Sequence, residues 1–296
     1  GGSIGGVIFP LMLRSLYTRV GFTWTMRIVA FMCGASLTLS IFLVKEDPSK
    51  RAQEPEDEEQ SKNASKLKKM AHYALSSFDY KALTEYKFLF CTIGSCFAEL
   101  ATGATLTYIS SYCIDLHYDE RDSFLIVTVL NTLSIVGGYF YSYIADRLIG
   151  RFNVMIIITA LLGVVGLAMW LPFGHKSRPV MFAFSALYGF FYGSLLNLAP
   201  VCCGQISKTD EFGRRYSTMY VLVGSSFLIG IPISGAIIGT GTLANYNKFI
   251  IYVSVLALAS SVFFFLSKSF AVHPHTPTSD DRTLFSLLRK SVVKRF

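Results

Sequence analysis

Long blocks of apolar residues dominate the chain, and most are long enough for one helix to cross a membrane. A helix needs roughly 20 residues to cross a hydrocarbon core about 30 Å thick. Seven blocks reach that length, at positions 25–44, 86–114, 123–145, 152–171, 180–204, 216–239 and 249–266. Strands of a membrane barrel would instead be alternating segments of about ten residues. The pattern therefore predicts an all-α, polytopic helical bundle in a membrane.

An eighth apolar block, residues 1–13, is too short to span a bilayer. It begins within an apolar pattern, and residue 1 is Gly rather than Met. We interpret it as the end of a helix whose start lies outside this sequence, so we expect the chain to be a fragment.

Composition and charge fit a multi-pass protein of the plasma membrane or of an organelle membrane. Apolar residues make up 52% and charged residues 16% of the chain, whereas soluble domains carry about 25% charged residues. With these spans, 20 Lys and Arg residues fall on the side of the long loop 45–85 and the tail 269–296, and seven on the other side. This bias predicts that the loop and tail are cytoplasmic. The net positive charge therefore reflects topology, and we expect a lipid bilayer rather than a nucleic acid as partner.

Cysteine and histidine placement argues against an enzyme. The six cysteines lie in or at the edges of the apolar blocks, and none has the spacing of a metal site. The five histidines all fall in loops or tails. The predicted spans therefore contain no histidine and no pair of carboxylates for catalysis within the membrane. We expect no metal and no cofactor.

A charged motif, A-D-R-L-I-G-R, occupies residues 145–151 between two spans. It resembles the D-R-x-G-R loop of the major facilitator superfamily, with one extra residue. In that family the loop is a conformational latch on the cytoplasmic side. Its Asp caps a neighbouring helix and its Arg residues bridge to carboxylates. The resemblance assigns this conformational role to Asp146, Arg147, Gly150 and Arg151.

Further segments resemble monocarboxylate-transporter-like members of that superfamily, which are common in fungi. They are G-G-S-I-G-G-V-I-F-P at 1–10, Y-G-F-F-Y-G at 188–193, E-F-G-R-R at 211–215 and G-I-P-I-S-G at 230–235. The implied alignment makes the apolar blocks helices five to twelve of twelve, with the first four missing. Residues 1–44 are then the end of the N-terminal six-helix half, and 45–85 are the central cytoplasmic loop. Residues 86–268 form the C-terminal half, and 269–296 are a cytoplasmic tail.

One position departs from the family pattern. The eighth helix usually carries an Arg about eight residues before the loop Asp, and in monocarboxylate transporters that Arg holds the substrate carboxylate. Here Gly138 occupies the position, with Ser134 one turn earlier. The family fold is compatible with this change, whereas a monocarboxylate substrate is no longer directly implied.

Glu99 is the one ionisable residue near the centre of a span. A charge there costs at least about 2.5 kcal/mol on insertion scales, so the carboxyl should face a cavity or be protonated. Two interpretations stay open, namely proton coupling or substrate contact, and a neutral carboxyl hydrogen-bonded to another helix. Other polar residues inside spans are further candidates for a substrate and proton pathway: Thr102, Tyr108, Asn131, Ser134, Tyr192 and Asn197.

Glycines and prolines inside the spans are interpreted as packing or hinge positions. Glycine pairs four residues apart favour close helix contact, and proline kinks a helix. These positions are Gly189, Gly193, Pro200, Gly230, Pro232 and Gly235.

Taken with the resemblance, the sequence predicts a secondary-active transporter of a small organic solute, monocarboxylate-like, with a proton as a second candidate partner. The implied mechanism is rocking of two helical halves about a midplane site. A transport-inactive relative that acts as a membrane sensor or scaffold is the alternative, and the absent Arg favours it.

Overall fold

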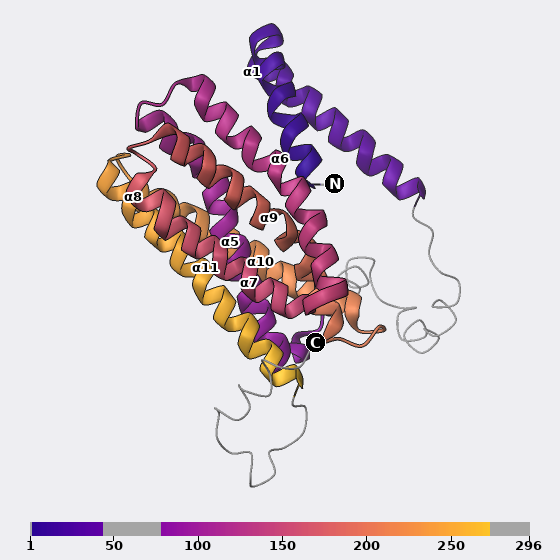
Figure 1. Cartoon of the computed structure of the whole chain (residues 1–296). Coiled ribbons are helices and arrows are strands. Elements are labelled where there is room, and N and C mark those ends of the chain that lie inside the picture. Colours follow the sequence, from indigo (N-terminus) through magenta and orange to yellow (C-terminus); the bar gives the residue numbers. More distant parts are fainter. Residues whose placement is uncertain (1, 44–77, 273–296) are drawn as a thin grey trace. The chain divides into compact units, whose positions relative to one another are not determined.

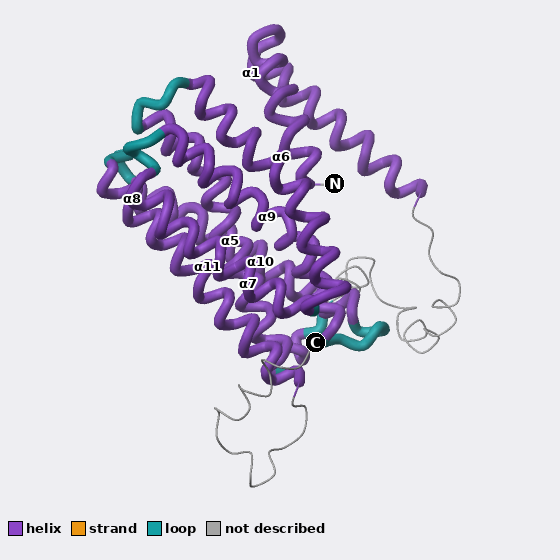
Figure 2. Tube along the Cα trace, viewed as in Figure 1, coloured by secondary structure: helices purple, strands orange, loops and turns teal. Residues whose placement is uncertain are grey.

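The computed structural model describes residues 2–43 and 78–272, and both stretches are almost entirely helical (Figures 1 and 2). No strand occurs in either stretch. Within them, seven helices are long and apolar enough to cross a membrane. They cover the seven predicted blocks, mostly with a few extra residues at their ends. The all-α membrane bundle predicted from the apolar pattern is thereby confirmed.

The first structural unit consists of α1 (Gly2–Leu43), which bends sharply at Gly21. Gly21 has φ 73° and ψ 172°, a conformation that residues with a Cβ rarely adopt. The apolar blocks 1–13 and 25–44 are therefore separated by a break at this single residue rather than by a longer loop, because helix continues on both sides of it. The arginines between the two blocks interrupt the apolar pattern, but arginine is a good helix former and does not interrupt the helix.

The second unit is a bundle of antiparallel helices joined by short connections. A 3₁₀ turn, η1 (Tyr80–Thr84), leads into it, and the π-helical turns η2 (Ala145–Ile149) and η3 (Gly166–Trp170) interrupt it. Its α-helices are α5 (Tyr86–Asp115), α6 (Glu120–Ile144), α7 (Arg151–Val165), α8 (Leu171–Phe173), α9 (Arg178–Gln205), α10 (Phe212–Ile238) and α11 (Leu243–Val272).

The helices of this bundle pack against one another in pairs, and a cluster of aromatic rings lies at one end. α6 packs along α9, α5 packs on α11 and α10, and α7 packs on α11 and α9. At one end, the fully buried rings of Tyr112, Trp170 and Tyr246 meet edge to face, with Tyr112 centroids 5.3 and 5.1 Å from the other two. Such aromatic pairs add stability beyond the area that they bury.

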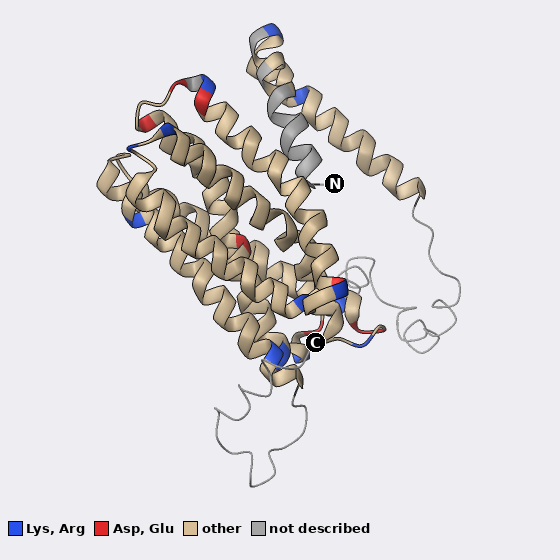
Figure 3. Cartoon of the chain, viewed as in Figure 1, with Lys and Arg blue, Asp and Glu red and all other residues tan. Residues whose placement is uncertain are grey.

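Charged side chains of the bundle gather at its two ends, with the exception of an acidic residue midway along it (Figure 3). We call the end that holds η2 and the start of α10 the latch end. At the opposite end, Arg178 binds Asp119 at 2.8 Å and Asp122 at 3.3 Å. The predicted central loop and tail fall largely on residues 44–77 and 273–296, which lie outside the described residues.

Candidate functional site

Glu99 lies midway along α5 and its side chain is buried, with a residue exposure of 5%. Its Oε1 has no hydrogen-bond partner among the described residues. Tyr220 of α10 and Tyr192 of α9 both lie within electrostatic range of the carboxyl. Side chains from three helices therefore surround this one buried carboxyl.

Other polar side chains share the Glu99 face of α5, because residues three, four or seven apart lie on one side of a helix. Thr92, two turns away, is 2% exposed and its Oγ1 has no partner among the described residues. Thr102 is also buried, but its hydroxyl donates to the backbone carbonyl of Ala98 at 2.9 Å. Thr92 and Glu99 thus have free hydrogen-bonding capacity here, whereas Thr102 is satisfied within its own helix.

Tyr108 lies away from Glu99 along the same helix. Nine residues of α-helix correspond to roughly 13 Å of axial rise. The Tyr108 hydroxyl donates to the carbonyl of Ile231 on α10 at 3.2 Å, and its ring meets Phe249 edge to face. The structure therefore places Tyr108 in the contact between α5 and α10 rather than beside the buried carboxyl.

Several candidates on α6 and α9 lie at the contact between these two helices, whereas Tyr192 lies near Glu99. Asn131 and Ser134 donate to carbonyls of their own helix, at 3.0 Å to Val127 and 2.7 Å to Asn131 respectively. Gly193 lies so close to α6 that a Cβ there would be 1.8 Å from the Ser134 carbonyl oxygen. At Gly189 the corresponding distance to the Leu130 carbonyl oxygen is 2.1 Å.

Gly138 belongs to the same close contact. A Cβ at this position would lie 3.1 Å from the Gly193 carbonyl oxygen and 3.2 Å from Nδ2 of Asn197. The position that bears an arginine in monocarboxylate transporters therefore holds a backbone contact and an amide. No guanidinium is available at that point.

The remaining glycine and proline candidates lie within α9 and α10. Pro200 is inside α9 and Pro232 inside α10. Gly230 faces the Leu100 side chain and Gly235 faces the Tyr108 hydroxyl, both on α5. These two glycines let α10 approach α5 closely on either side of Pro232.

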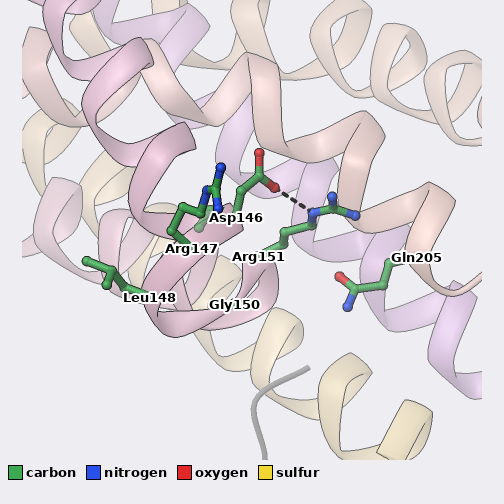
Figure 4. A pocket seen from close by; sticks show the side chains of 7 residues that line it. Asp146, Arg147, Leu148, Gly150, Arg151 and Gln205 are labelled. Atoms are coloured by element: carbon green, nitrogen blue, oxygen red, sulfur yellow. Dashed lines mark hydrogen bonds and ion pairs between the residues drawn. The ribbon is translucent and has the colours of Figure 1, made fainter.

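The A-D-R-L-I-G-R segment at 145–151, which we call the latch motif, forms the turn between α6 and α7, shown in Figure 4. The extra residue relative to D-R-x-G-R is accommodated by the π-helical turn η2, and Gly150 follows with φ 94°. Asp146 accepts a hydrogen bond from Nε of Arg151 at 3.0 Å. A cavity of about 220 Å³ opens beside this pair, lined also by Arg147, Leu148 and Gln205. Insertions of this kind commonly form π-bulges at functional sites.

Comparison with known proteins identifies the family. The family model for the Major Facilitator Superfamily matches residues 1–177 and 125–295. The chain belongs to the Major Facilitator Superfamily. The membership of this superfamily that the sequence resemblance implied is thus confirmed.

Three fungal relatives show how much of a family member this chain represents. It is 42% identical over 281 residues to the riboflavin transporter MCH5 of Saccharomyces cerevisiae, covering 92% of this chain and 52% of that protein. An MFS-type transporter of Gibberella moniliformis is 30% identical over 268 residues, with coverages of 90% and 59%. The MFS-type transporter opdF of Penicillium oxalicum is 33% identical over 237 residues, with coverages of 80% and 51%. The chain spans about half the length of these relatives.

Within this Major Facilitator Superfamily bundle, the latch end contains an ion cluster that the sequence reasoning missed. Arg215 of α10 is buried, with 7% of its side chain exposed, and binds Glu85 through two nitrogens at 2.5 and 3.1 Å. It also approaches Glu211 at 3.1 Å and Asp79 at 3.6 Å. The Arg215 guanidinium holds the pKa of Glu85 below its usual range. The spacing of Glu211 and Arg215, one helical turn, was the sequence signal available.

Tyr220, which lies within electrostatic range of Glu99, was also missed. Phe212, Tyr216 and Tyr220 are spaced by four residues, and their successive ring centroids are 5.6 and 4.6 Å apart. This spacing predicts an aromatic stripe on α10 from sequence alone. Nothing local in the sequence indicates that the stripe ends at the carboxyl of α5.

Proposed function

We propose that the full-length protein is a secondary transporter that carries a small organic solute across a membrane by alternating access. The chain is an integral, multi-pass membrane protein of a transporter family. The observation that carries the proposal is Glu99, a carboxyl buried at mid-span, one oxygen of which has no hydrogen-bond partner in the described part of the chain. Ionisable groups at such depth are expensive, so they are characteristic of pathways for solutes and ions.

Riboflavin is the first solute to test. The relative that is 42% identical is named a riboflavin transporter. A monocarboxylate, suggested by the sequence resemblance, has less support because Gly138 replaces the arginine that would hold it.

Transport is tested by solute exchange in liposomes that contain the purified full-length protein. Labelled riboflavin or lactate outside the vesicles should exchange for unlabelled solute inside. A transport-inactive sensor or scaffold, the alternative that the absent arginine favours, would bind solute without exchanging it. Folded protein that exchanges no small organic solute would contradict the proposal.

A proton that accompanies the solute would bind at Glu99. We expect Glu99→Gln to lose proton-driven accumulation while it keeps solute exchange, because glutamine has the same shape but takes up no proton. Uptake against external pH, compared between wild type and variant in full-length protein, measures this. If Glu99→Gln accumulates solute with an unchanged pH profile, Glu99 carries no coupled proton.

The latch pair gives a second, independent prediction. We expect Asp146→Asn to slow transport about two- to fivefold with unchanged surface expression, because an exposed ion pair contributes up to about 1 kcal/mol to one conformation. Asp210→Asn is the matched control, since Asp210 is an exposed carboxylate at the same end of the bundle. Equal rates for both variants would show that the Asp146–Arg151 pair has no part in transport.

A further inference from the structure

The cavity beside the latch motif has a positively charged lining. Its volume is about 220 Å³, and it is lined by Arg147 and Arg151 against a single carboxylate, Asp146. In the view of Figure 4 the two arginines lie on either side of that carboxylate, and Gln205 lies beyond Arg151. Pockets for drug-sized organic molecules are roughly 300–1,000 Å³. This smaller cavity therefore fits a small anionic group better than a whole organic solute.

Both guanidiniums keep hydrogen-bonding capacity toward the cavity. Arg151 uses its Nε to bind Asp146 at 3.0 Å, which leaves its two terminal nitrogens. Arg147 makes no ion pair with any residue that the structure describes. Guanidinium groups bind phosphate through two parallel N–H groups. Positive charge with suitable donors thus remains after Asp146 is paired.

The start of α7 adds to the positive potential of the cavity. Its first turn contains no acidic residue, and its N-cap residue, Gly150, has no side chain to accept from the first N–H groups. The beginning of a helix attracts anions, because its first N–H groups are unpaired and its dipole is positive there. In the same turn, Asn153 Oδ1 accepts a hydrogen bond at 2.8 Å from Nζ of Lys268, a residue that is 1% exposed. A buried charge is screened less than an exposed one, so this lysine reinforces the field.

Gln205 contributes the opposite kind of group. Its side chain lines the cavity, and its buried Oε1 has no hydrogen-bond partner among the described residues. Buried polar atoms in native proteins are almost always hydrogen-bonded, and an amide oxygen needs a donor. A hydroxyl is a better donor here than an ammonium, because the two arginines repel a cation. A ligand that satisfies the whole lining therefore carries a phosphate and a hydroxyl.

Apolar side chains of the same turn place the cavity at the membrane surface. Leu148 and Ile149 are 55% and 39% exposed, and Figure 4 shows Leu148 extending away from the charged groups. Arginines beside exposed apolar side chains are typical of the level of the lipid headgroups. The distribution of Lys and Arg predicts that this end faces the cytoplasm, where the leaflet carries anionic lipids. Lipid headgroups and water-soluble phosphates can both reach such a site.

We propose that the cavity beside the latch motif binds a phosphate monoester on a hydroxylated group, such as the phosphorylated inositol headgroup of a lipid. Arg147 and Arg151 hold the phosphate, and Gln205 Oε1 accepts a hydrogen bond from a neighbouring hydroxyl. A phosphate monoester carries a charge of about −1.5 to −2 and three strong acceptor oxygens, which matches two guanidiniums and the first N–H groups of a helix. The site goes beyond the proposed transport function and does not depend on which solute is carried.

Binding is tested by microscale thermophoresis with purified full-length protein and three matched probes. Dioctanoyl phosphatidylinositol 4-phosphate carries the monoester, dioctanoyl phosphatidylinositol lacks it, and inositol 1,4-bisphosphate has the phosphorylated headgroup without acyl chains. We expect the Kd of the 4-phosphate lipid to be about tenfold or more below that of the lipid without the monoester, as charge-assisted hydrogen bonds imply. Equal affinity for inositol 1,4-bisphosphate would assign the site to free phosphates as well as lipids. Binding of the lipid probe alone would assign it to the membrane.

Substitutions then separate recognition in the cavity from general charge and from folding. Arg147→Gln should raise the Kd of the 4-phosphate lipid about ten- to hundredfold. Arg214→Gln removes the same charge from an exposed arginine at the latch end, so it should leave the Kd little changed. Asp146→Asn should lower the Kd, because it removes the negative charge beside the phosphate. Damage to the fold cannot produce this opposite sign.

Three outcomes overturn the proposal. If the lipids with and without the monoester bind equally, the phosphate is not recognised. If Arg147→Gln and Arg214→Gln weaken binding equally, the protein responds to general surface charge and not to this cavity. If Asp146→Asn weakens binding as Arg147→Gln does, both act through the structure of the turn. None of these measurements involves solute exchange, so a failure here is distinguishable from a failure of the transport function.

Discussion

Arg215→Gln should lower the melting temperature of the purified protein by roughly 5–10 °C, the largest effect expected of any charge substitution in the bundle. Arg215 is surrounded by three carboxylates, those of Glu85, Glu211 and Asp79. Removal of the guanidinium takes away the counter-charge that they share and leaves Lys87, 3.3 Å from Glu85, and Lys208, 3.8 Å from Glu211. Breaking a fully buried pair costs about 3–5 kcal/mol. The three acids are partly exposed, so we expect about 2–3 kcal/mol here.

Arg214→Gln is the matched control, because it removes the same charge from the neighbouring, exposed residue. It should change the melting temperature little. Arg215→Lys should fall between the two, since lysine keeps the charge but cannot form the two-nitrogen contact with Glu85. If Arg215→Gln and Arg214→Gln have the same melting temperature, the ion cluster around Arg215 contributes no net stability.

The pH dependence of stability provides a further check on the same cluster. The pKa of Glu85 is lowered in the folded protein, chiefly by its hydrogen bond to Arg215. Its stabilising contribution is therefore present above the unfolded pKa, about 4.3, and is lost as the pH falls through the folded pKa. In Arg215→Gln the hydrogen bond is absent, so acidification over this range should cost less stability than in wild type.

The fold could be read from the sequence because apolar block length is a local property. Each span appears as a predominantly apolar run, and the structure places a helix on every one. A break between residues 13 and 25 was expected, but its restriction to Gly21 was not, because one glycine among good helix formers gives a weak signal. The extra residue of the latch motif was visible, but its accommodation in a π-helical turn depends on how α6 and α7 are held.

The candidate site was less accessible to sequence reasoning because its contacts are long-range. Glu99 stands out as a charge inside a span, and its burial follows from that position. The proximity of Glu99 to Tyr220 and the pairing of Arg215 with Glu85 each involve residues more than 100 positions apart. Only the packing of α5 against α10 brings these groups together, and no local pattern encodes that packing.

Gly193→Ala should prevent much of the full-length protein from reaching a monodisperse folded form, because α6 and α9 would have to move apart. The added Cβ would lie 1.8 Å from the Ser134 carbonyl oxygen. A backbone atom cannot rotate away as a side chain can, so separation by about an ångström or more is needed, and it would loosen the neighbouring contact at Gly189. Overpacking of this kind costs typically about 1–3 kcal/mol and occasionally more.

A graded series of alanine substitutions tests the steric cause. At Gly138 the nearest atom to an added Cβ is 3.1 Å away, so Gly138→Ala should be milder than Gly193→Ala. At Gly213 nothing lies within 4 Å, so Gly213→Ala should be neutral or slightly stabilising, as alanine is the better helix former. Size-exclusion profiles of the fluorescently tagged proteins report the folded fraction. If the Gly193→Ala profile equals that of Gly213→Ala, the packing of α6 against α9 does not depend on this contact. If the loss of folded protein is largest for Gly193→Ala, smaller for Gly138→Ala and absent for Gly213→Ala, the loss is caused by the close backbone approach of the two helices.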